Sequence, residues 1–175
     1  ETTKLFYRKY GDGPPLVILH GLYGSSDNWM TIARKISNKY CVWLPDMRNH
    51  GSSPHDIVHS FEAMAGDLSE LAEKNNLGKF FLAGHSMGGK AAILFALKWP
   101  EKLNGLLIAD VSPFTVQASV SLAYDYHSRI LGAVSKTDIS GASSRKEIET
   151  MLLSGISSSR DIALIMKNLR RNADN

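Results

Sequence analysis

The chain of 175 residues has the length of one domain, with 43% hydrophobic residues, 21% charged residues and a formal net charge of +3. This composition is typical of a soluble globular protein, and the apolar runs are far shorter than the roughly 20 residues of a transmembrane helix, so we expect no membrane span. Lys and Arg are dispersed without an aromatic-interleaved basic stripe, which argues against a nucleic-acid partner, and no signal peptide pattern is visible, which favours a cytoplasmic protein.

From residue 4 to residue 110 the pattern alternates between strands and helices, as is typical of a mostly parallel sheet with helices on its faces. Apolar runs mark the strands, and apolar side chains at i, i+3, i+4 and i+7 mark the helices. In chain order we expect strands over KLFYRKY (4–10) and LVILH (16–20), a helix over 29–36, a strand over CVWLP (41–45), a helix over 61–72, a strand over KFFLAG (79–84), a helix over 87–99 and a strand over LNGLLIAD (103–110). Polar residues at 25–28 and Ser60 are the expected caps of the first two helices.

After Asp110 the alternation ends and only helical patterns follow. Helices are expected over SLAYDYHSRIL (121–131), after a capping box at 144–147, and over 162–169. The sequence therefore predicts a core over residues 1–111 and a helical lid over 112–175. Because no strand pattern follows it, the last predicted strand should form an open edge of the sheet.

The hexapeptide GHSMGG (84–89) stands between a predicted strand and a predicted helix. Glycine tolerates positive φ and close backbone approach, so a sharp elbow here would lift Ser86 clear of the sheet. A G-x-S-x-G match alone also fits a serine that caps a helix, whereas the flanking strand and helix favour a nucleophile. The loop HGLYGS (20–25) is suited to direct a backbone N–H toward a developing oxyanion, together with the N–H of Met87.

Four stretches, HGLYGS (20–25), DMRNHGSSP (46–54), GHSMGGK (84–90) and IADVSP (108–113), resemble those of the α/β-hydrolase superfamily, in particular the small YbfF-type esterases. The resemblance implies an α/β-hydrolase fold and hydrolysis of small acyl esters or thioesters, with no cofactor. It also implies roles for four residues. Ser86 would be the nucleophile, the backbone N–H groups of Leu22 and Met87 would be the oxyanion donors, and Asp110 would be the acid.

Asp110 is a candidate on position alone, because a carboxylate at the carboxyl end of a strand lies where open α/β sheets hold their sites. The alternative is a turn or capping aspartate before Ser112. Asp46 also ends a strand, but Arg48 and His50 are so near that we expect it to anchor its own loop through charge-assisted hydrogen bonds.

Three further side chains, those of Tyr23, Tyr124 and His127, are candidates for the lining of an acyl pocket. The alternative is that the lid aromatics only pack against the body of the protein. Cys41 is expected to be a small buried hydrophobe, since a single cysteine forms no internal disulfide.

Most of the remaining histidines are expected to be structural, with His20 and His85 holding their loops by hydrogen bonds. A metal site is not expected after the CVWLP strand, because the polar turn there lacks the rigidity that three ligands need. The residues considered for such a site are His50, His55, Asp56 and His59.

The catalytic base is missing from the pattern. In this superfamily the order along the chain is Ser, acid, His, and after Asp110 the only histidine is His127, within the predicted lid. The sequence therefore predicts either that a C-terminal segment with the closing strands and the base is carried elsewhere, or that the chain is a degenerate homologue.

Alternative functions stay open at this stage. A carbon–carbon bond hydrolase or lyase would use the same scaffold, and a non-catalytic binding module would keep the pocket without the base. A nucleotide-binding domain is excluded by spacing, since Ser86 stands where G-x-G-x-x-G needs its second glycine and no G-K-[ST] follows.

Overall fold

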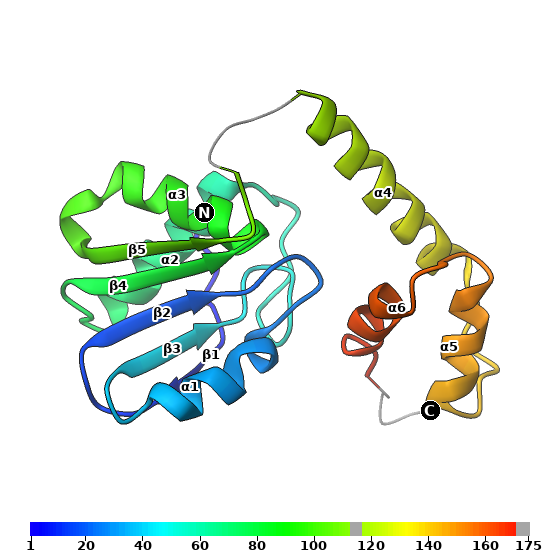
Figure 1. The fold of residues 1–175 in the computed structure, drawn as a ribbon, viewed down its shortest axis with the longest axis horizontal. Helices are drawn as coiled ribbons and strands as arrows, with labels where there is room; N and C mark the ends of the chain where they lie inside the picture. Colours follow the sequence, from blue (N-terminus) through cyan, green and yellow to red (C-terminus); the bar gives the residue numbers. More distant parts are fainter. Residues whose placement is uncertain (113–116, 171–175) are drawn as a thin grey trace. The chain divides into compact units, whose positions relative to one another are not determined.

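The computed structural model describes residues 1–112 and 117–170. Pro113 of the IADVSP stretch and residues 114–116 and 171–175 of the predicted lid lie outside the described residues. The chain divides into two compact units, Glu1–Pro113 and Phe114–Asn175 (Figure 1). The assignment of the second unit as a lid stays a prediction.

The first unit is built on a five-stranded sheet with the strand order β1-β3-β2-β4-β5. Only β1 is antiparallel to its neighbour, and the other four strands are parallel, which confirms the predicted mostly parallel sheet. The strands are β1 (Tyr7–Tyr10), β2 (Pro15–Leu19), β3 (Cys41–Pro45), β4 (Phe80–His85) and β5 (Leu103–Ala109).

The first strand is three residues shorter than predicted, because only Tyr7–Tyr10 pair with β3 and the chain before them is bonded to Asp67 and to residues that follow β3. Thr3 donates its N–H to a carboxylate oxygen of Asp67 at 2.6 Å, and Phe6 donates its N–H to Ser53 Oγ at 2.9 Å. Leu5 between them is buried in the core. The apolar pattern of KLFYRKY therefore includes residues 4–6, which pack against the first unit but are not part of the sheet.

Among its described residues the first unit has three α-helices, which lie where the apolar periodicity predicts them, and two short 3-10 helices, which it does not predict. They are η1 (Ser26–Trp29), α1 (Met30–Ile36), α2 (Phe61–Lys74), α3 (Met87–Lys98) and η2 (Pro100–Lys102). Ser25 and Asn28 form a capping box at η1, and Ser60 caps α2 by accepting the N–H of Ala63 at 3.2 Å, so both predicted caps are confirmed.

Both faces of the sheet are covered, because alternate side chains of each strand point to opposite faces. On β2, Val17 and Leu19 belong to the core cluster shared with α2 and α3, whereas Ile18 packs in a separate cluster with Ala33 of α1. Figure 1 shows α2 and α3 together on one face and α1 on the other. This is the layered arrangement that the alternating sequence pattern predicted.

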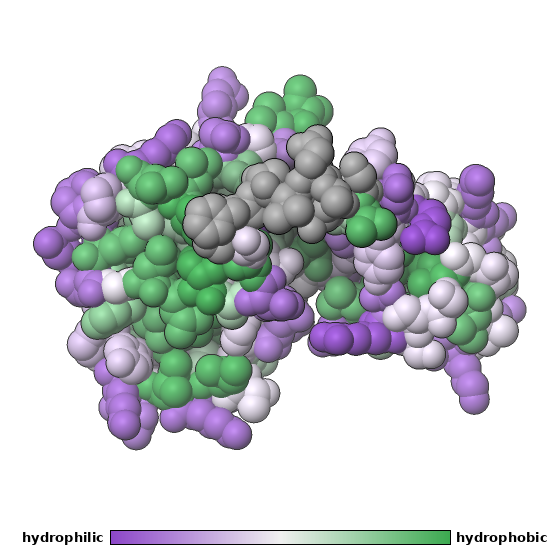
Figure 2. Space-filling model, turned by 45° about the horizontal axis from the view of Figure 1, so that its top comes forward, coloured by the Kyte–Doolittle hydropathy of each residue, from purple (hydrophilic) through white to green (hydrophobic). Residues whose placement is uncertain are grey.

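β5 is the edge strand of the sheet, as predicted. Leu106 is 43% exposed and Leu107 is 60% exposed. Figure 2 shows apolar surface gathered over this side of the first unit. An edge strand with apolar side chains is a site where further chain can pair.

The second unit contains only helices among its described residues, which confirms the helical prediction for 117–170. These are α4 (Gln117–Lys136), α5 (Arg145–Leu153) and α6 (Ser159–Met166). The predicted capping box of α5 is only half formed. Ser144 Oγ accepts the N–H of Glu147 at 3.2 Å, but the Glu147 carboxylate accepts the N–H of Ser143 and not that of Ser144.

A fully buried ion pair joins the loop after β3 to helix α2. Arg48 donates from Nε and Nη2 to the two carboxylate oxygens of Asp67, each at 2.7 Å, and neither side chain is exposed. Arg48 Nη1 also donates to the carbonyl of Val58 at 2.8 Å. The Asp67 carboxylate raises the pKa of Arg48 above its ordinary value. The pair therefore fixes the N-terminal segment and residues 46–60 to the core.

Removal of the carboxylate in Asp67→Ala should lower the free energy of unfolding by about 3–5 kcal/mol, because the buried Arg48 guanidinium would lose both of its short carboxylate bonds and keep only the partly exposed Asp56 carboxylate, at 3.7 Å, as a counter-charge. Urea unfolding followed by circular dichroism measures this loss. The matched control is Glu73→Ala, which breaks the partly exposed Lys102–Glu73 pair and should change stability little. Equal losses in the two variants would contradict this interpretation of the buried pair.

Candidate active site

Ser86 occupies a sharp elbow between β4 and α3. Its backbone has φ +52° and ψ −115°, which lies outside the helical and strand regions, so the predicted positive φ is confirmed. Its N–H donates to the carbonyl of Ala109 on β5 at 3.0 Å, and its carbonyl accepts the N–H of Lys90 at 3.1 Å. The strained residue is therefore held from both sides by regular structure.

The glycines of the elbow allow α3 to lie directly against the sheet. A Cβ atom on Gly88 would stand 2.6 Å from the carbonyl oxygen of His20 and 2.7 Å from Leu19 Cβ. A Cβ atom on Gly84 would collide with the carbonyl of Gly88. Any larger side chain at either position would push the helix away from β2 and β4. The tight packing fixes where Ser86 stands.

The topology brings the HGLYGS loop and Asp110 to either side of Ser86. β4 lies between β2 and β5, all three strands run parallel, and parallel strands end at the same edge of the sheet. A Cβ atom on Gly21 would be 3.4 Å from Ser86 Cβ, so the loop after β2 contacts the elbow. This edge is where open α/β sheets bind their ligands.

Two backbone N–H groups at this edge are the predicted oxyanion donors. Within residues 1–112 and 117–170, the N–H groups of Leu22 and Met87 form no hydrogen bond with another residue. Met87 is the first residue of α3, where the N–H groups have no partner within the helix and carry the positive end of the helix dipole. Such groups suit a negatively charged oxygen.

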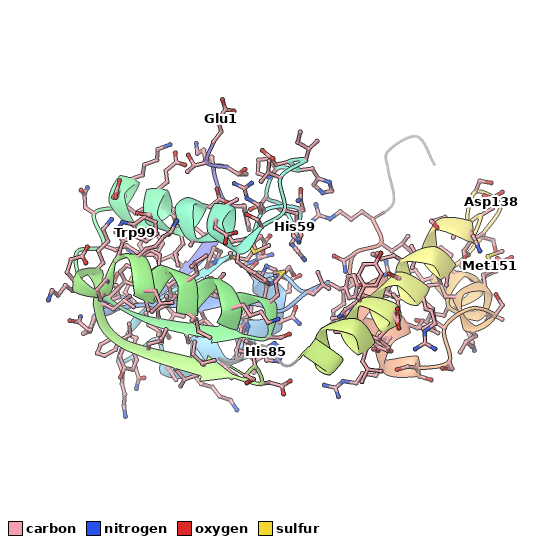
Figure 3. The ribbon with its side chains drawn as sticks, turned by 90° about the horizontal axis from the view of Figure 1, so that it is seen from above. Glu1, His59, His85, Trp99, Asp138 and Met151 are labelled. Atoms are coloured by element: carbon pink, nitrogen blue, oxygen red, sulfur yellow. The ribbon has the colours of Figure 1, made fainter. Side chains whose placement is uncertain are left out.

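Asp110 follows β5 directly, with φ +55° and a side chain that is 86% exposed. Its Oδ2 lies 3.5 Å from Nε2 of His85, the last residue of β4, which Figure 3 labels beside the start of α3. Tyr23 has φ +61°. Five non-glycine residues in the described part of the chain have positive φ, and three of them, Tyr23, Ser86 and Asp110, lie at this edge. Strained backbone of this kind gathers at functional sites.

Asp46 is buried and anchors its own loop, as predicted, but not through the expected cations. Its Oδ1 accepts the N–H of Ser26 at 2.6 Å and its Oδ2 accepts the N–H of Ser52 at 2.8 Å. Arg48 pairs with Asp67 instead. β3, which Asp46 follows, lies two strands away from β4, so this carboxylate is remote from the elbow.

Three histidine rings form a row from the HGLYGS loop toward residue 59. The ring centroids of His20 and His50 are 5.1 Å apart, and those of His50 and His59 are 5.8 Å apart. Burial lowers the pKa of His20 to about 4, and burial also lowers the pKa values of His50 and His59. All three are therefore neutral at pH 7. No group of three or more His, Cys, Asp or Glu side chains in the described ranges is arranged to hold a metal ion.

Acid should destabilise the fold through His20. Its pKa in the folded state is below the ordinary value of 6.5, so its contribution is fully present above pH 6.5 and is lost as the pH falls toward 4. The loss should reach about 3 kcal/mol, and urea unfolding at stepped pH values measures it. In His20→Asn the free energy of unfolding should fall less steeply between pH 6.5 and pH 4. The slope that remains should be due partly to His50 and His59. Parallel curves for the two proteins would contradict the assignment.

Tyr124 and His127 lie on α4 in the second unit. Tyr124 is 72% exposed, and His127 is half-buried with its ring against Tyr126 at a centroid distance of 5.2 Å. Only Tyr23, of the three predicted pocket residues, belongs to the same unit as Ser86. The assignment of Tyr124 and His127 to an acyl pocket stays a prediction.

Sequence reasoning missed two contacts of this region. The His85–Asp110 contact joins the ends of two neighbouring strands, and nothing in the local pattern marks it. The Arg48–Asp67 pair could have been suspected from the sequence, because Asp67 lies on the apolar face of α2 between Met64 and Leu68. A carboxylate in such a stripe needs a buried partner.

Comparison with known proteins agrees with this geometry. The sequence profile of a family described as "alpha/beta hydrolase fold" matches residues 14–136. A solved structure described as a marine microorganism esterase superposes with a TM-score of 0.92 at 42% identity, over 99% of this chain and 66% of that chain. None of the described helices is both long and apolar enough to cross a membrane.

Two curated relatives have similar sequences. The sn-1-specific diacylglycerol lipase ABHD11 of Xenopus laevis is 45% identical over 103 residues, which is 58% of this chain and 33% of that protein. Esterase YbfF of Escherichia coli is 32% identical over 158 residues, or 88% of this chain and 58% of that protein. The match thus spans about a third of the diacylglycerol lipase and somewhat over half of the esterase. Taken with the parallel sheet, the serine elbow and the profile match over most of its length, this likeness shows that the chain belongs to the α/β-hydrolase family.

Proposed function

We propose that this chain supplies the nucleophile, the oxyanion donors and the acid of a serine hydrolase that cleaves small acyl esters or thioesters. The observation that carries the proposal is the strained elbow at Ser86, beside two N–H groups without a partner among the described residues. A residue that only capped the helix would need neither positive φ nor such neighbours, and the Ser86 side chain makes no capping hydrogen bond.

In the proposed reaction, Ser86 Oγ attacks the carbonyl carbon of the ester while a base removes the hydroxyl proton. The carbonyl oxygen becomes an oxyanion, which accepts hydrogen bonds from the N–H groups of Leu22 and Met87. When the tetrahedral intermediate collapses, the alcohol or thiol leaves with the proton that the base returns. Water then attacks the acyl-enzyme by the same route, which releases the carboxylic acid and restores the Ser86 hydroxyl.

The names of the relatives support an ester as substrate, since they are described as a diacylglycerol lipase and as esterases. Asp110 is proposed as the acid because β5 is the strand next to β4 and its side chain is exposed at the same edge as Ser86. The base that this acid would orient is proposed to come from a segment outside this sequence.

A fluorophosphonate probe, which phosphonylates activated serines, tests the proposal. The protein for this test is a chimera that joins this chain to the part of the marine esterase that has no counterpart in it, since the shared part superposes closely. Mass spectrometry of peptides should locate the adduct on Ser86, and Ser86→Ala should remain unlabelled. A folded chimera that gains no adduct, or gains it on another serine, would overturn the proposal.

A further inference from the structure

The carbonyl oxygen of Gly21 accepts two hydrogen bonds inside the HGLYGS loop. One comes from the N–H of Gly24 at 3.0 Å, and the other joins it to Nδ1 of His20 at 2.8 Å. The other ring nitrogen of His20, Nε2, lies 3.0 Å from the N–H of Met47. A backbone N–H can only donate, so Nε2 is the acceptor and carries no proton. The proton of the neutral ring is therefore on Nδ1, which donates to Gly21.

His20 is 1% exposed, so its ring is shielded from solvent, whereas Gly21 is half-buried. Burial lowers the pKa of the ring and keeps it neutral, and its two hydrogen bonds then select one tautomer, with Nδ1–H toward the loop and the Nε2 lone pair toward Met47. The ring links the HGLYGS loop after β2 to the first residues after β3.

The orientation of the Gly21 carbonyl decides the orientation of the next N–H. A peptide group is planar and trans, so the N–H of Leu22 points opposite to the C=O of Gly21. The carbonyl is held on the side of His20 and Gly24, and the N–H is thereby turned away from them. A Cβ atom built on Gly21 would be 3.4 Å from Ser86 Cβ, so this N–H belongs to the loop that lies beside the elbow.

We propose that His20 is a positioning residue for the oxyanion site: through its Nδ1–H bond to the Gly21 carbonyl, it fixes the peptide plane that aims the N–H of Leu22 at the reacting carbonyl. The proposal rests on the proposed function, because it needs an oxyanion beside Ser86. His20 itself touches neither substrate nor reacting atoms. Its action is to prevent the Gly21–Leu22 peptide from rotating, since oxyanion donors act only when they are oriented in advance.

A histidine that only packed between the two loops would fill the same space as one that positions the peptide. The test therefore removes the hydrogen bond of one ring nitrogen at a time. His20→Asn keeps an amide donor near the position of Nδ1 and loses the acceptor for Met47. His20→Gln keeps an acceptor near the position of Nε2 and loses the donor for Gly21. The matched controls are His50→Asn and His50→Gln, because the His50 ring is adjacent but its Nδ1 bonds the carbonyl of Arg48.

The kinetic readout is hydrolysis of p-nitrophenyl acetate by the chimera described above. His20→Gln should lose about 10²–10³-fold in kcat with little change in KM, which is the effect of removing one oxyanion donor. His20→Asn should keep most of the wild-type kcat, although both variants lose one buried hydrogen bond and should lose similar stability. Equal losses of kcat in the two variants would overturn the proposal, and so would an equal loss in the His50 controls.

The structural readout uses the 175-residue chain and does not depend on activity. The carbonyl ¹³C resonance of Gly21 reports hydrogen bonds to its oxygen, so it should shift in His20→Gln and stay near the wild-type position in His20→Asn. A resonance that moves equally in both variants would refute the role of Nδ1. If the chimera is inactive while the resonance behaves as expected, the proposed reaction is wrong and the positioning of the Gly21 peptide by His20 still stands.

Discussion

The isolated 175-residue chain is expected to hydrolyse p-nitrophenyl acetate about a millionfold more slowly than the chimera that carries a base. In a serine hydrolase, loss of the histidine alone removes about 10⁶ in kcat, because the serine hydroxyl is a weak nucleophile at neutral pH. The oxyanion donors and substrate binding retain about 10³–10⁴ over the reaction in water. The chain alone should therefore show a small residual rate.

The positions of the histidines support this expectation. His20 and His50 are buried and bonded to backbone groups, and His85 lies in the chain next to Ser86 and faces Asp110. A base must reach the Ser86 hydroxyl within about 2.6–3.2 Å. His127 is the only histidine that follows the acid along the chain, and it belongs to the second unit.

Three variants test the missing base. Ser86→Ala in the chimera should fall to the rate of the isolated chain or below, and His127→Ala should leave the rate of the isolated chain unchanged. Turnover is followed by release of p-nitrophenolate. Full activity in the isolated chain that His127→Ala abolishes would make His127 the base and would place α4 over the elbow during the reaction.

The local parts of this fold could be predicted from the sequence. Apolar periodicity indicated the strands and the three α-helices of the first unit but not the short helices η1 and η2. Polar residues such as Ser25 and Ser60 marked helix caps, because these patterns depend on neighbours within one or two turns. The positive φ of Ser86 was also predictable, since glycines at the elbow and the change from strand to helix restrict the backbone there.

The contacts that organise the site are long-range, and the sequence did not predict them. The His20–Met47 hydrogen bond spans 27 positions, and the Arg48–Asp67 pair spans 19. Which polar side chain finds which partner depends on how strands β2 and β3 align, and the local pattern carries no information on this. For the same reason, the loop-anchoring role of Asp46 was predicted correctly while its partners, the N–H groups of Ser26 and Ser52, were not.

Asp110→Asn in the chimera should lower kcat by about 10⁴-fold without destabilising the protein. In Ser-His-Asp enzymes the acid holds the histidine in the tautomer that accepts the serine proton, and replacing the carboxylate with an amide favours the wrong tautomer at that cost. The Asp110 side chain is 86% exposed, and its Oδ2 lies 3.5 Å from His85 Nε2. Its loss should therefore leave the unfolding curve unchanged, even though turnover nearly stops.

Asp46→Asn is the matched control, because it makes the same chemical change at the other strand end. Asp46 is 2% exposed and accepts two backbone N–H bonds, so its replacement should lower the free energy of unfolding by about 2 kcal/mol or more, since hydrogen bonds to a charged group are stronger than neutral ones. It should keep most of kcat under conditions where the variant is folded. The two aspartates thus separate stability from catalysis. If Asp46→Asn loses kcat by 10⁴ while Asp110→Asn does not, the assignment of the acid to β5 is wrong, and the acid then belongs to the end of β3 despite its distance from the elbow.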